Sequence, residues 1–135
     1  MDKEKLISVA MDARDCAYVP YSNFKVGAAL LTKGGKVYSG CNIESASYTP
    51  TCCAERVAFL KAVSENEKDF EAIAVVGGYD NKDRDYCYPC GVCRQVMMEF
   101  CNPSTFKVIV AKNNRDFKEH LLNEILPFGF GPSDL

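Results

Sequence analysis

The chain has 135 residues, of which 47% are hydrophobic and 25% charged, so it is long enough for one hydrophobic core and too short for two. We therefore expect one folded domain over residues 1–135 rather than a disordered protein. The formal net charge is −2 and the basic residues are scattered among acidic ones, which argues against a nucleic-acid partner because no basic stripe could neutralise a run of phosphates.

The sequence also bears on the compartment. No apolar run is long enough to span a bilayer, and the charged stretch Met1–Ile7 contains no apolar core of a secretion signal. We therefore expect a cytoplasmic protein with no membrane partner. In that reducing compartment the eight cysteines should be thiols, and clustered thiols there more often bind metal or perform chemistry than form disulfides.

A helix and a β-hairpin are predicted for the first third of the chain. Apolar residues recur at helical spacing over Lys5–Tyr18, and Pro20 then ends the pattern. Alternation over Phe24–Leu31 is typical of a strand, and a turn at Gly34-Gly35 leads into a second strand at Lys36–Cys41. These two strands should pair with each other.

The rest of the chain alternates helices with buried strands. Cys53–Ser64 is almost entirely apolar, so we expect this helix to be buried on most of its surface. Ala72–Gly77 and Phe106–Ala111 have the unbroken apolar pattern of parallel strands covered on both faces, and a helix at Gly91–Phe100 and a long polar loop at Tyr79–Pro89 lie between them. This order, with two β-α-β crossovers, predicts an α/β fold, specifically a three-layer α/β/α domain around a mixed sheet.

Three cysteines lie where two predicted helices begin. Cys53 starts one helix, and Cys90 and Cys93 bracket the start of the other. Unpaired backbone N–H groups and the helix dipole favour thiolate over thiol at such ends. Structural zinc normally has four protein ligands, whereas catalytic zinc keeps one position open. Three thiolates therefore predict one catalytic Zn²⁺ per subunit.

Glu55 follows Cys53 by two residues, so on a helix its carboxylate projects to a different side, near the metal but free not to bind it. Water activated by a metal beside a carboxylate is the apparatus of hydrolytic attack on an electron-poor carbon. Zinc-dependent base deaminases carry a His- or Cys-x-Glu element followed by Pro-Cys-x-x-Cys, and this chain has both. Glu55 is therefore our candidate catalytic residue.

At this point the chain resembles the small homotetrameric cytidine deaminases over nearly its whole length. Four segments carry the resemblance: Tyr21–Ala29, Cys41–Glu44, Cys53–Arg56 and Pro89–Gln95. The resemblance implies hydrolytic deamination of cytidine and deoxycytidine in pyrimidine salvage. It also implies that Phe24 lines the pyrimidine pocket, that Asn42 and Glu44 bind the ribose hydroxyls, and that the backbone of Ala54 lies beside the base.

The C-terminal tail adds an expectation about assembly. Leu126-Pro127 and Phe130-Gly131-Pro132 are similar to the tail of this family, whose aromatic residue covers the active site of a neighbouring subunit. The family usually has a small residue where this chain has Phe128, so either phenylalanine could cover the site. We expect a homotetramer with shared active sites in which Phe130 binds substrate and Phe128 packs at the interface.

Arg56 is expected to act on the metal through its ligands. Three thiolates, one Zn²⁺ and one hydroxide carry a net charge of about −2, which opposes ionisation of water. A guanidinium that hydrogen-bonds the cysteine sulfurs would lower this excess. The competing interpretation, a surface ion pair, is disfavoured by the apolar helix around Arg56.

Other interpretations of these motifs remain open. Cys87 could join the three thiols in a structural zinc site, or begin an iron–sulfur motif that lacks its last cysteine because Met97 stands there. The substrate could instead be a nucleoside analogue such as blasticidin S. The single histidine, His120, lies outside the motifs. The four remaining cysteines are interpreted as small core residues: Cys16, Cys41, Cys52 and Cys101.

Overall fold

The computed structural model describes all 135 residues. Its first helix, α1 (Lys3–Arg14), begins after Asp2, whose carboxylate caps the helix by accepting a hydrogen bond from the backbone N–H of Lys5 at 3.1 Å. The prediction that this helix continues to Tyr18 is wrong. The backbone N–H of Tyr18 instead donates to the carbonyl of Asn42 at 3.0 Å, so a strand-like pairing replaces the last helical turn.

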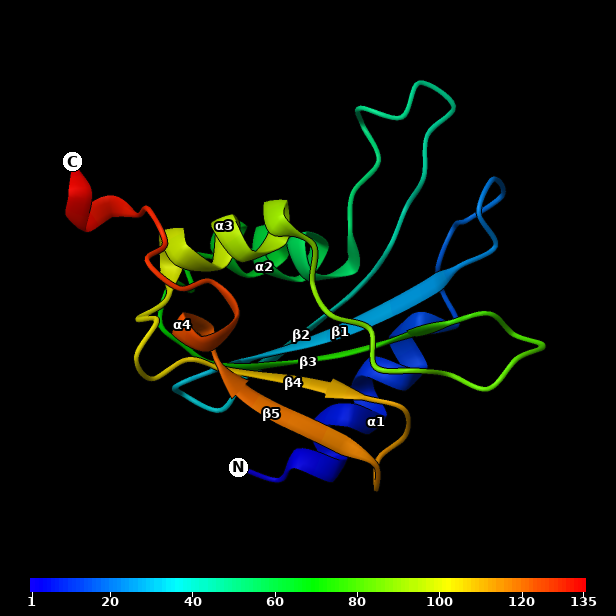
Figure 1. Cartoon of the computed structure of the whole chain (residues 1–135), viewed down its shortest axis with the longest axis horizontal. Helices are drawn as coiled ribbons and strands as arrows, with labels where there is room; N and C mark the ends of the chain where they lie inside the picture. Colours follow the sequence, from blue (N-terminus) through cyan, green and yellow to red (C-terminus); the bar gives the residue numbers. More distant parts are fainter.

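A five-stranded mixed sheet forms the centre of the molecule, in the order β2-β1-β3-β4-β5 (Figure 1). The predicted hairpin is confirmed, and β1 also pairs antiparallel with β3, while β3 and β4 are parallel and β4 and β5 antiparallel. The strands are β1 (Lys25–Thr32), β2 (Val37–Cys41), β3 (Phe70–Gly78), β4 (Lys107–Ala111) and β5 (Phe117–Leu121).

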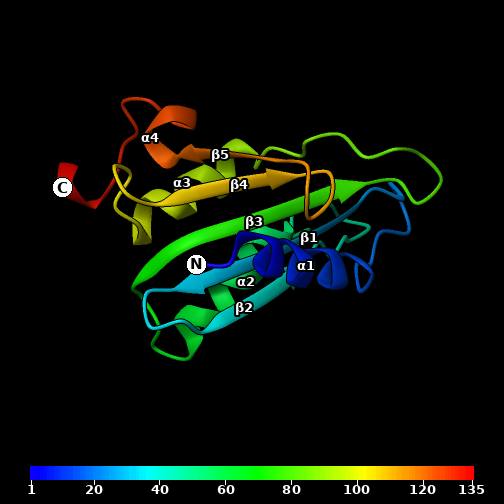
Figure 2. The same cartoon turned by 90° about the horizontal axis from the view of Figure 1, so that it is seen from below.

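Helices cover both faces of this sheet, which confirms the predicted three layers (Figure 2). The helix α1 covers one face, and α2 (Ala54–Ser64) and α3 (Gly91–Phe100) cover the other. The core is divided accordingly: Leu30, Phe59 and Phe106 belong to the cluster on the α2 and α3 side, and Ile7 and Ala29 to the cluster under α1. Leu30 and Ala29 face opposite ways because successive strand residues point to opposite faces.

The second helix is less enclosed than its composition predicts. Ala54, Ala58, Phe59 and Ala62 are fully buried, but Leu60 is 58% exposed. The expectation that most of this surface is buried was therefore too broad, because α2 contacts the sheet along one side only. None of the helices combines the length and the apolar character that crossing a membrane requires.

Two elements near the C-terminus were not predicted. The strand β5 carries the exposed residues Lys118 and Glu119, so it has no apolar run, and it is held at the sheet edge by backbone pairing with β4. The four-residue helix α4 (Leu122–Ile125) follows, and its buried Leu122 belongs to the core. A short 3-10 turn at Pro132–Asp134 precedes the last residue, Leu135.

Glycine at position 27 allows α1 to lie directly on β1. An added Cβ would overlap the carbonyl oxygen of Ala10 and the backbone of Arg14. Gly27→Ala should therefore lower the free energy of unfolding by about 3 kcal/mol or more, since rigid backbone rather than a flexible side chain must move. Urea denaturation measures the loss. Gly34→Ala is the control, because its Cβ would meet nothing closer than 3.8 Å; equal losses in both variants would contradict this account.

Candidate metal centre and active site

Three thiols meet where two helices begin on the same side of the sheet. Cys53 is the N-cap of α2, Cys90 is the N-cap of α3, and Cys93 lies in the first turn of α3. Their sulfur atoms lie within 4.8 Å of one another, and those of Cys53 and Cys90 are 3.8 Å apart. Tetrahedral zinc with Zn–S bonds of about 2.3 Å separates two sulfur ligands by about 3.8 Å. The three residues therefore fit a zinc ion and leave one coordination position open.

The surroundings of these thiols favour the thiolate form at one of them. The thiol of Cys93 and the guanidinium of Arg56 hydrogen-bond to the sulfur of Cys53 and hold the pKa of Cys53 below its ordinary value. Arg56 Nη2 lies 3.5 Å from that sulfur and 3.4 Å from the carbonyl oxygen of Thr51. The structure thus places Arg56 beside the ligand cluster and not in a surface ion pair.

Glu55 is the only buried carboxylate of the protein, with 4% of its surface exposed. Burial removes water from its charged form and raises the pKa of Glu55 to about 7. A carboxyl group with a pKa near neutrality can both donate and accept a proton under physiological conditions. Cys53 lies two residues before Glu55 along the chain, and both residues line one cavity, so this carboxyl group lies beside the thiol cluster.

A cavity of about 170 Å³ connects these groups. Its lining residues come from β1, the segment after β2, the start of α2 and the loop before α3: Val26, Asn42, Cys53, Ala54, Glu55, Cys87, Tyr88 and Cys90. The structure therefore brings together five residues that the sequence singled out, from segments up to 48 positions apart (Asn42 to Cys90). Their convergence on one cavity makes this cavity the candidate active site.

Asn42 and Phe24 are joined at the edge of this cavity. The side-chain amide of Asn42 accepts a hydrogen bond from the backbone N–H of Val26 at 2.9 Å and donates one to the carbonyl of Phe24 at 2.8 Å. Phe24 is partly buried, and its ring makes an edge-on contact with Tyr79 at 5.1 Å between ring centroids. Asn42 thus fixes the start of β1 as well as lining the cavity.

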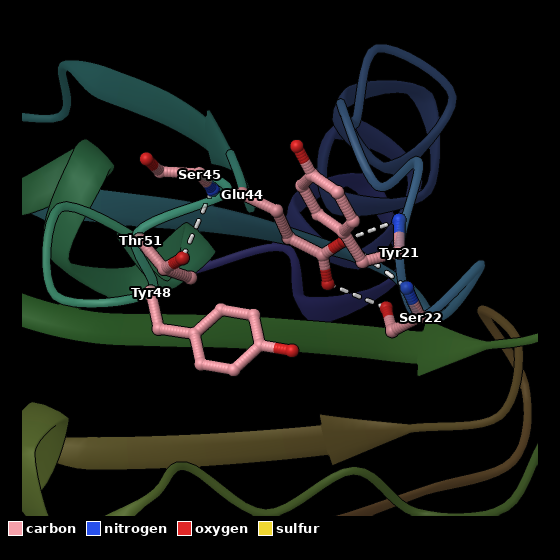
Figure 3. Close-up of a pocket in the computed structure, with 6 residues that line it drawn as sticks. All are labelled: Tyr21, Ser22, Glu44, Ser45, Tyr48 and Thr51. Atoms are coloured by element: carbon pink, nitrogen blue, oxygen red, sulfur yellow. Dashed lines mark hydrogen bonds between the residues drawn. The ribbon is translucent and has the colours of Figure 1, made fainter.

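Glu44 lies in a separate, more open cavity of about 440 Å³, which Figure 3 shows. Its carboxylate accepts hydrogen bonds from the backbone N–H groups of Tyr21 and Ser22 at 3.1 and 3.2 Å and from the Ser22 hydroxyl at 2.5 Å. These bonds lower the pKa of Glu44, the Ser22 hydroxyl contributing most. Glu44 is therefore an ionised acceptor held at a fixed place, next to the exposed ring of Tyr48.

The C-terminal tail carries the two phenylalanines away from the subunit's own cavity. Phe128 is fully exposed and Phe130 is 59% exposed, and neither lines the cavity of Glu55. Gln95 on α3 donates a hydrogen bond to the carbonyl of Phe130 at 2.7 Å and so fixes where the tail leaves the molecule.

The remaining cysteines and the single histidine lie outside the thiol cluster. Cys87 lines the cavity, but its sulfur is not among the three that converge, and burial raises the pKa of this thiol. All eight cysteines are unpaired. The interpretation of the other four as core residues was right only for Cys101; Cys16 is exposed, and Cys41, at the end of β2, and Cys52, in the segment before α2, are half-buried. His120 lies on β5 and contacts the hydroxyl of Tyr88.

One residue that organises the site was given no role in the sequence-based prediction. Arg94 donates hydrogen bonds to the carbonyl of Pro89 at 2.7 Å and to that of Ile125 at 2.5 Å. It therefore links the loop that carries Cys90 to the end of α4. Arg94 lies in the segment Pro89–Gln95 that carries the family resemblance, but nothing local shows that one of its partners lies 31 residues further on.

A mixed α/β sheet with three convergent thiols and a buried carboxyl group defines a metal-dependent hydrolytic enzyme. Residues 1–111 match the family model described as the cytidine and deoxycytidylate deaminase zinc-binding region. The cytidine deaminase of Halalkalibacterium halodurans is 50% identical over 135 residues, which cover 100% of this chain and 98% of the relative. The cytidine deaminase of Sporosarcina psychrophila is 48% identical over 135 residues, which cover 100% of this chain and 96% of that relative.

Solved structures agree with these sequence matches. The crystal structure of cytidine deaminase from Burkholderia pseudomallei is 45% identical and superposes with a TM-score of 0.86, over 96% of this chain and 100% of that one. The chain belongs to the cytidine and deoxycytidylate deaminase family. The zinc-binding region of this family and the thiol cluster identify zinc as the cofactor.

Proposed function

We propose that the protein hydrolyses cytidine and deoxycytidine to uridine and deoxyuridine with release of ammonia, in pyrimidine salvage. The observation that carries this proposal is a buried carboxyl group with a pKa of about 7 in the same cavity as Cys53 and Cys90. The names of the relatives, cytidine deaminase in each case, support the substrate. Free thiols fit a location in the cytoplasm, where disulfides are rare.

The three cysteines and Glu55 have separate roles in the proposed reaction. Cys53, Cys90 and Cys93 would hold one zinc ion per subunit, which acidifies water and so supplies a nucleophile at neutral pH. Glu55 takes up one proton from the attacking water and passes it to N3 of the pyrimidine, and it then takes the remaining proton of the added hydroxyl group and delivers it to the departing amine. Water and cytidine are thereby converted to ammonia and uridine.

Arg56 and the cavity walls support this proton transfer. The guanidinium beside the Cys53 sulfur offsets part of the negative charge of the thiolates. Ala54 is fully buried and lines the cavity, so its backbone is available to a base that enters there. We assign Phe24 to the wall of the pyrimidine pocket, and Asn42 and Glu44 to the ribose hydroxyls.

An absorbance assay tests the proposed function. Purified zinc-loaded protein should deaminate cytidine and deoxycytidine, and should leave adenosine and blasticidin S unchanged under the same conditions. Free cytosine should be a poor substrate, because each ribose hydrogen bond that is not made costs about 1 to 3 kcal/mol. Faster turnover of blasticidin S than of cytidine would replace this substrate assignment, and efficient deamination of cytosine would remove the ribose roles of Asn42 and Glu44.

We further propose that the enzyme is a homotetramer in which Phe130 covers the active site of a neighbouring subunit, and that Phe128 packs at the interface. The support is the exposure of both rings, complete for Phe128 and 59% for Phe130. Phe130→Ala should cost about 1 to 3 kcal/mol of transition-state binding, the value of one base stack, and so reduce activity without abolishing it. The ratio kcat/KM measures this loss.

Mixed oligomers test whether Phe130 of one subunit covers the active site of another. When Phe130→Ala chains are refolded together with Glu55→Ala chains, some sites combine an intact Glu55 with a Phe130 from the other chain. Activity per intact Glu55 should then rise above that of Phe130→Ala alone. If verified mixed oligomers give only the sum of the two parents, the tail acts within its own subunit.

A further inference from the structure

A second polar cavity, of about 530 Å³, shares no lining residue with the cavity of Glu55. Its lining residues include the last residue of α1 and the residues that follow β3 and β4. These three element ends lie at the same end of the molecule (Figures 1 and 2). The carboxyl ends of parallel strands are the usual place for ligands in α/β proteins. The cavity is lined by Arg14, Tyr79, Asp80, Lys82, Asp83, Arg84, Lys112 and Asn113.

The charge of this cavity is positive although the whole chain has a net charge of −2. Asp80 is neutralised by Arg14 and Lys25, whose nitrogens lie 3.1 and 2.8 Å from its carboxylate oxygens. Only Asp83 then opposes three cationic side chains that take part in none of the ion pairs of the protein: Lys82, Arg84 and Lys112. Such an unbalanced group of cations favours an anion.

Arg84 is held in place before any ligand arrives. Its Nε donates a hydrogen bond to the carbonyl oxygen of Lys112 at 2.9 Å, and no other hydrogen bond of its guanidinium is made within the protein. Its aliphatic part crosses Gly78, where an added Cβ would lie 2.7 Å from Cγ of Arg84. A fixed guanidinium with free terminal nitrogens matches the bidentate geometry of phosphate oxygens.

The other polar groups of the cavity are also donors. The side-chain oxygen of Asn113 accepts hydrogen bonds from two backbone N–H groups at 2.9 Å, which leaves its amide nitrogen free to donate. The ammonium groups of Lys82 and Lys112 lie over the rings of Tyr79 and Tyr86, at 5.1 and 4.8 Å from the ring centres. Each ammonium thus has a preferred position while its hydrogen-bonding capacity remains available.

We propose that this cavity binds phosphate groups, either of a nucleotide or as inorganic phosphate. Arg84 would hold two phosphate oxygens, and Lys82, Lys112 and the amide nitrogen of Asn113 would bind the others. The volume of about 530 Å³ lies within the usual range of small-ligand sites, about 300 to 1,000 Å³. This site is separate from the deaminase cavity and does not depend on the assignment of its substrate.

Isothermal titration calorimetry on the zinc-loaded protein at low ionic strength tests this proposal, with inorganic phosphate, ATP and adenosine as separate ligands. At least one of the two phosphate ligands should bind with a dissociation constant below about 1 mM, and adenosine should not bind at this site. Arg84→Ala and Lys112→Ala should each weaken binding about tenfold or more, because each removes a charge-assisted hydrogen bond. Raising the salt concentration to physiological ionic strength should also weaken it.

Lys118→Ala is the matched control, since Lys118 lies over the same Tyr86 ring at 4.7 Å but does not line the cavity. It should change the dissociation constant by less than about twofold. Tighter binding of ATP identifies the nucleotide as ligand, and equal binding of phosphate identifies the free anion. Failure of both inorganic phosphate and ATP to bind with a dissociation constant below about 1 mM, or equal loss in Lys112→Ala and Lys118→Ala, overturns the proposal. Retained zinc content and deaminase activity verify the fold of each variant. If Arg84→Ala does not fold, the change in binding by Lys112→Ala is sufficient to test the proposal.

Discussion

Glu55→Gln should lower the turnover of cytidine by about 10³-fold or more while the protein keeps its zinc and its fold. The amide has almost the shape of the carboxyl group but cannot accept and release a proton, and general acid–base catalysis by one group contributes about 10²- to 10⁴-fold. Because Glu55 serves more than one proton transfer in our mechanism, the loss should lie toward the upper end of this range. Steady-state kinetics and elemental analysis on the same sample measure both quantities.

Nucleoside binding by Glu55→Gln distinguishes a role of Glu55 in proton transfer from a purely structural role. If Glu55 acts in proton transfer, the variant should still bind a uridine product, which calorimetry can measure. A variant that loses zinc together with activity would instead show that Glu55 supports the metal centre. The burial of Glu55 makes this distinction necessary, since a buried carboxyl group can also stabilise its surroundings.

Cys90→Ala should remove the zinc and with it essentially all activity. Replacing even a residue that only supports a metal ligand typically costs about 10- to 100-fold in metal affinity, so loss of one of three ligands should exceed 100-fold. Cys90 is exposed, so its replacement leaves no cavity in the core. Zinc content after gel filtration measures the effect.

Cys87→Ala is the matched control for this variant. Cys87 lies three residues before Cys90 and lines the same cavity, but its sulfur does not belong to the cluster of three. The control should retain full zinc content and activity. Loss of zinc from Cys87→Ala would show that four cysteines bind the metal, and the structural-site interpretation would then replace the catalytic one.

The layers of the fold were predicted correctly from the sequence, whereas the edge strand β5 and the end of α1 were not. Apolar runs at β3 and β4 and the hairpin turn at Gly34-Gly35 between β1 and β2 identified four of the five strands, because buried strands must be apolar and tight turns favour glycine. The edge strand β5 was missed because one of its faces is open to water and its residues Lys118 and Glu119 carry no apolar pattern. The end of α1 was misplaced because the pairing of Tyr18 with the segment after β2 is a long-range contact.

The thiol cluster could be predicted because the motif spacing places all three cysteines at helix starts. The structure confirms that their sulfurs converge. The other contacts of the site are set by tertiary structure, which no local pattern reveals. Examples are the two backbone hydrogen bonds of Asn42 and the connection that Arg94 makes between Pro89 and Ile125.

X-ray absorption at the zinc edge tests the central claim most directly, namely that three cysteine sulfurs bind a catalytic zinc and leave one position for water. The spectrum of the purified enzyme should show three sulfur neighbours at about 2.3 Å and one oxygen neighbour at about 2.0 Å. Addition of a nucleoside product should change only the oxygen contribution. A spectrum with four sulfur neighbours, unaffected by nucleoside, would contradict the account and identify a closed structural site.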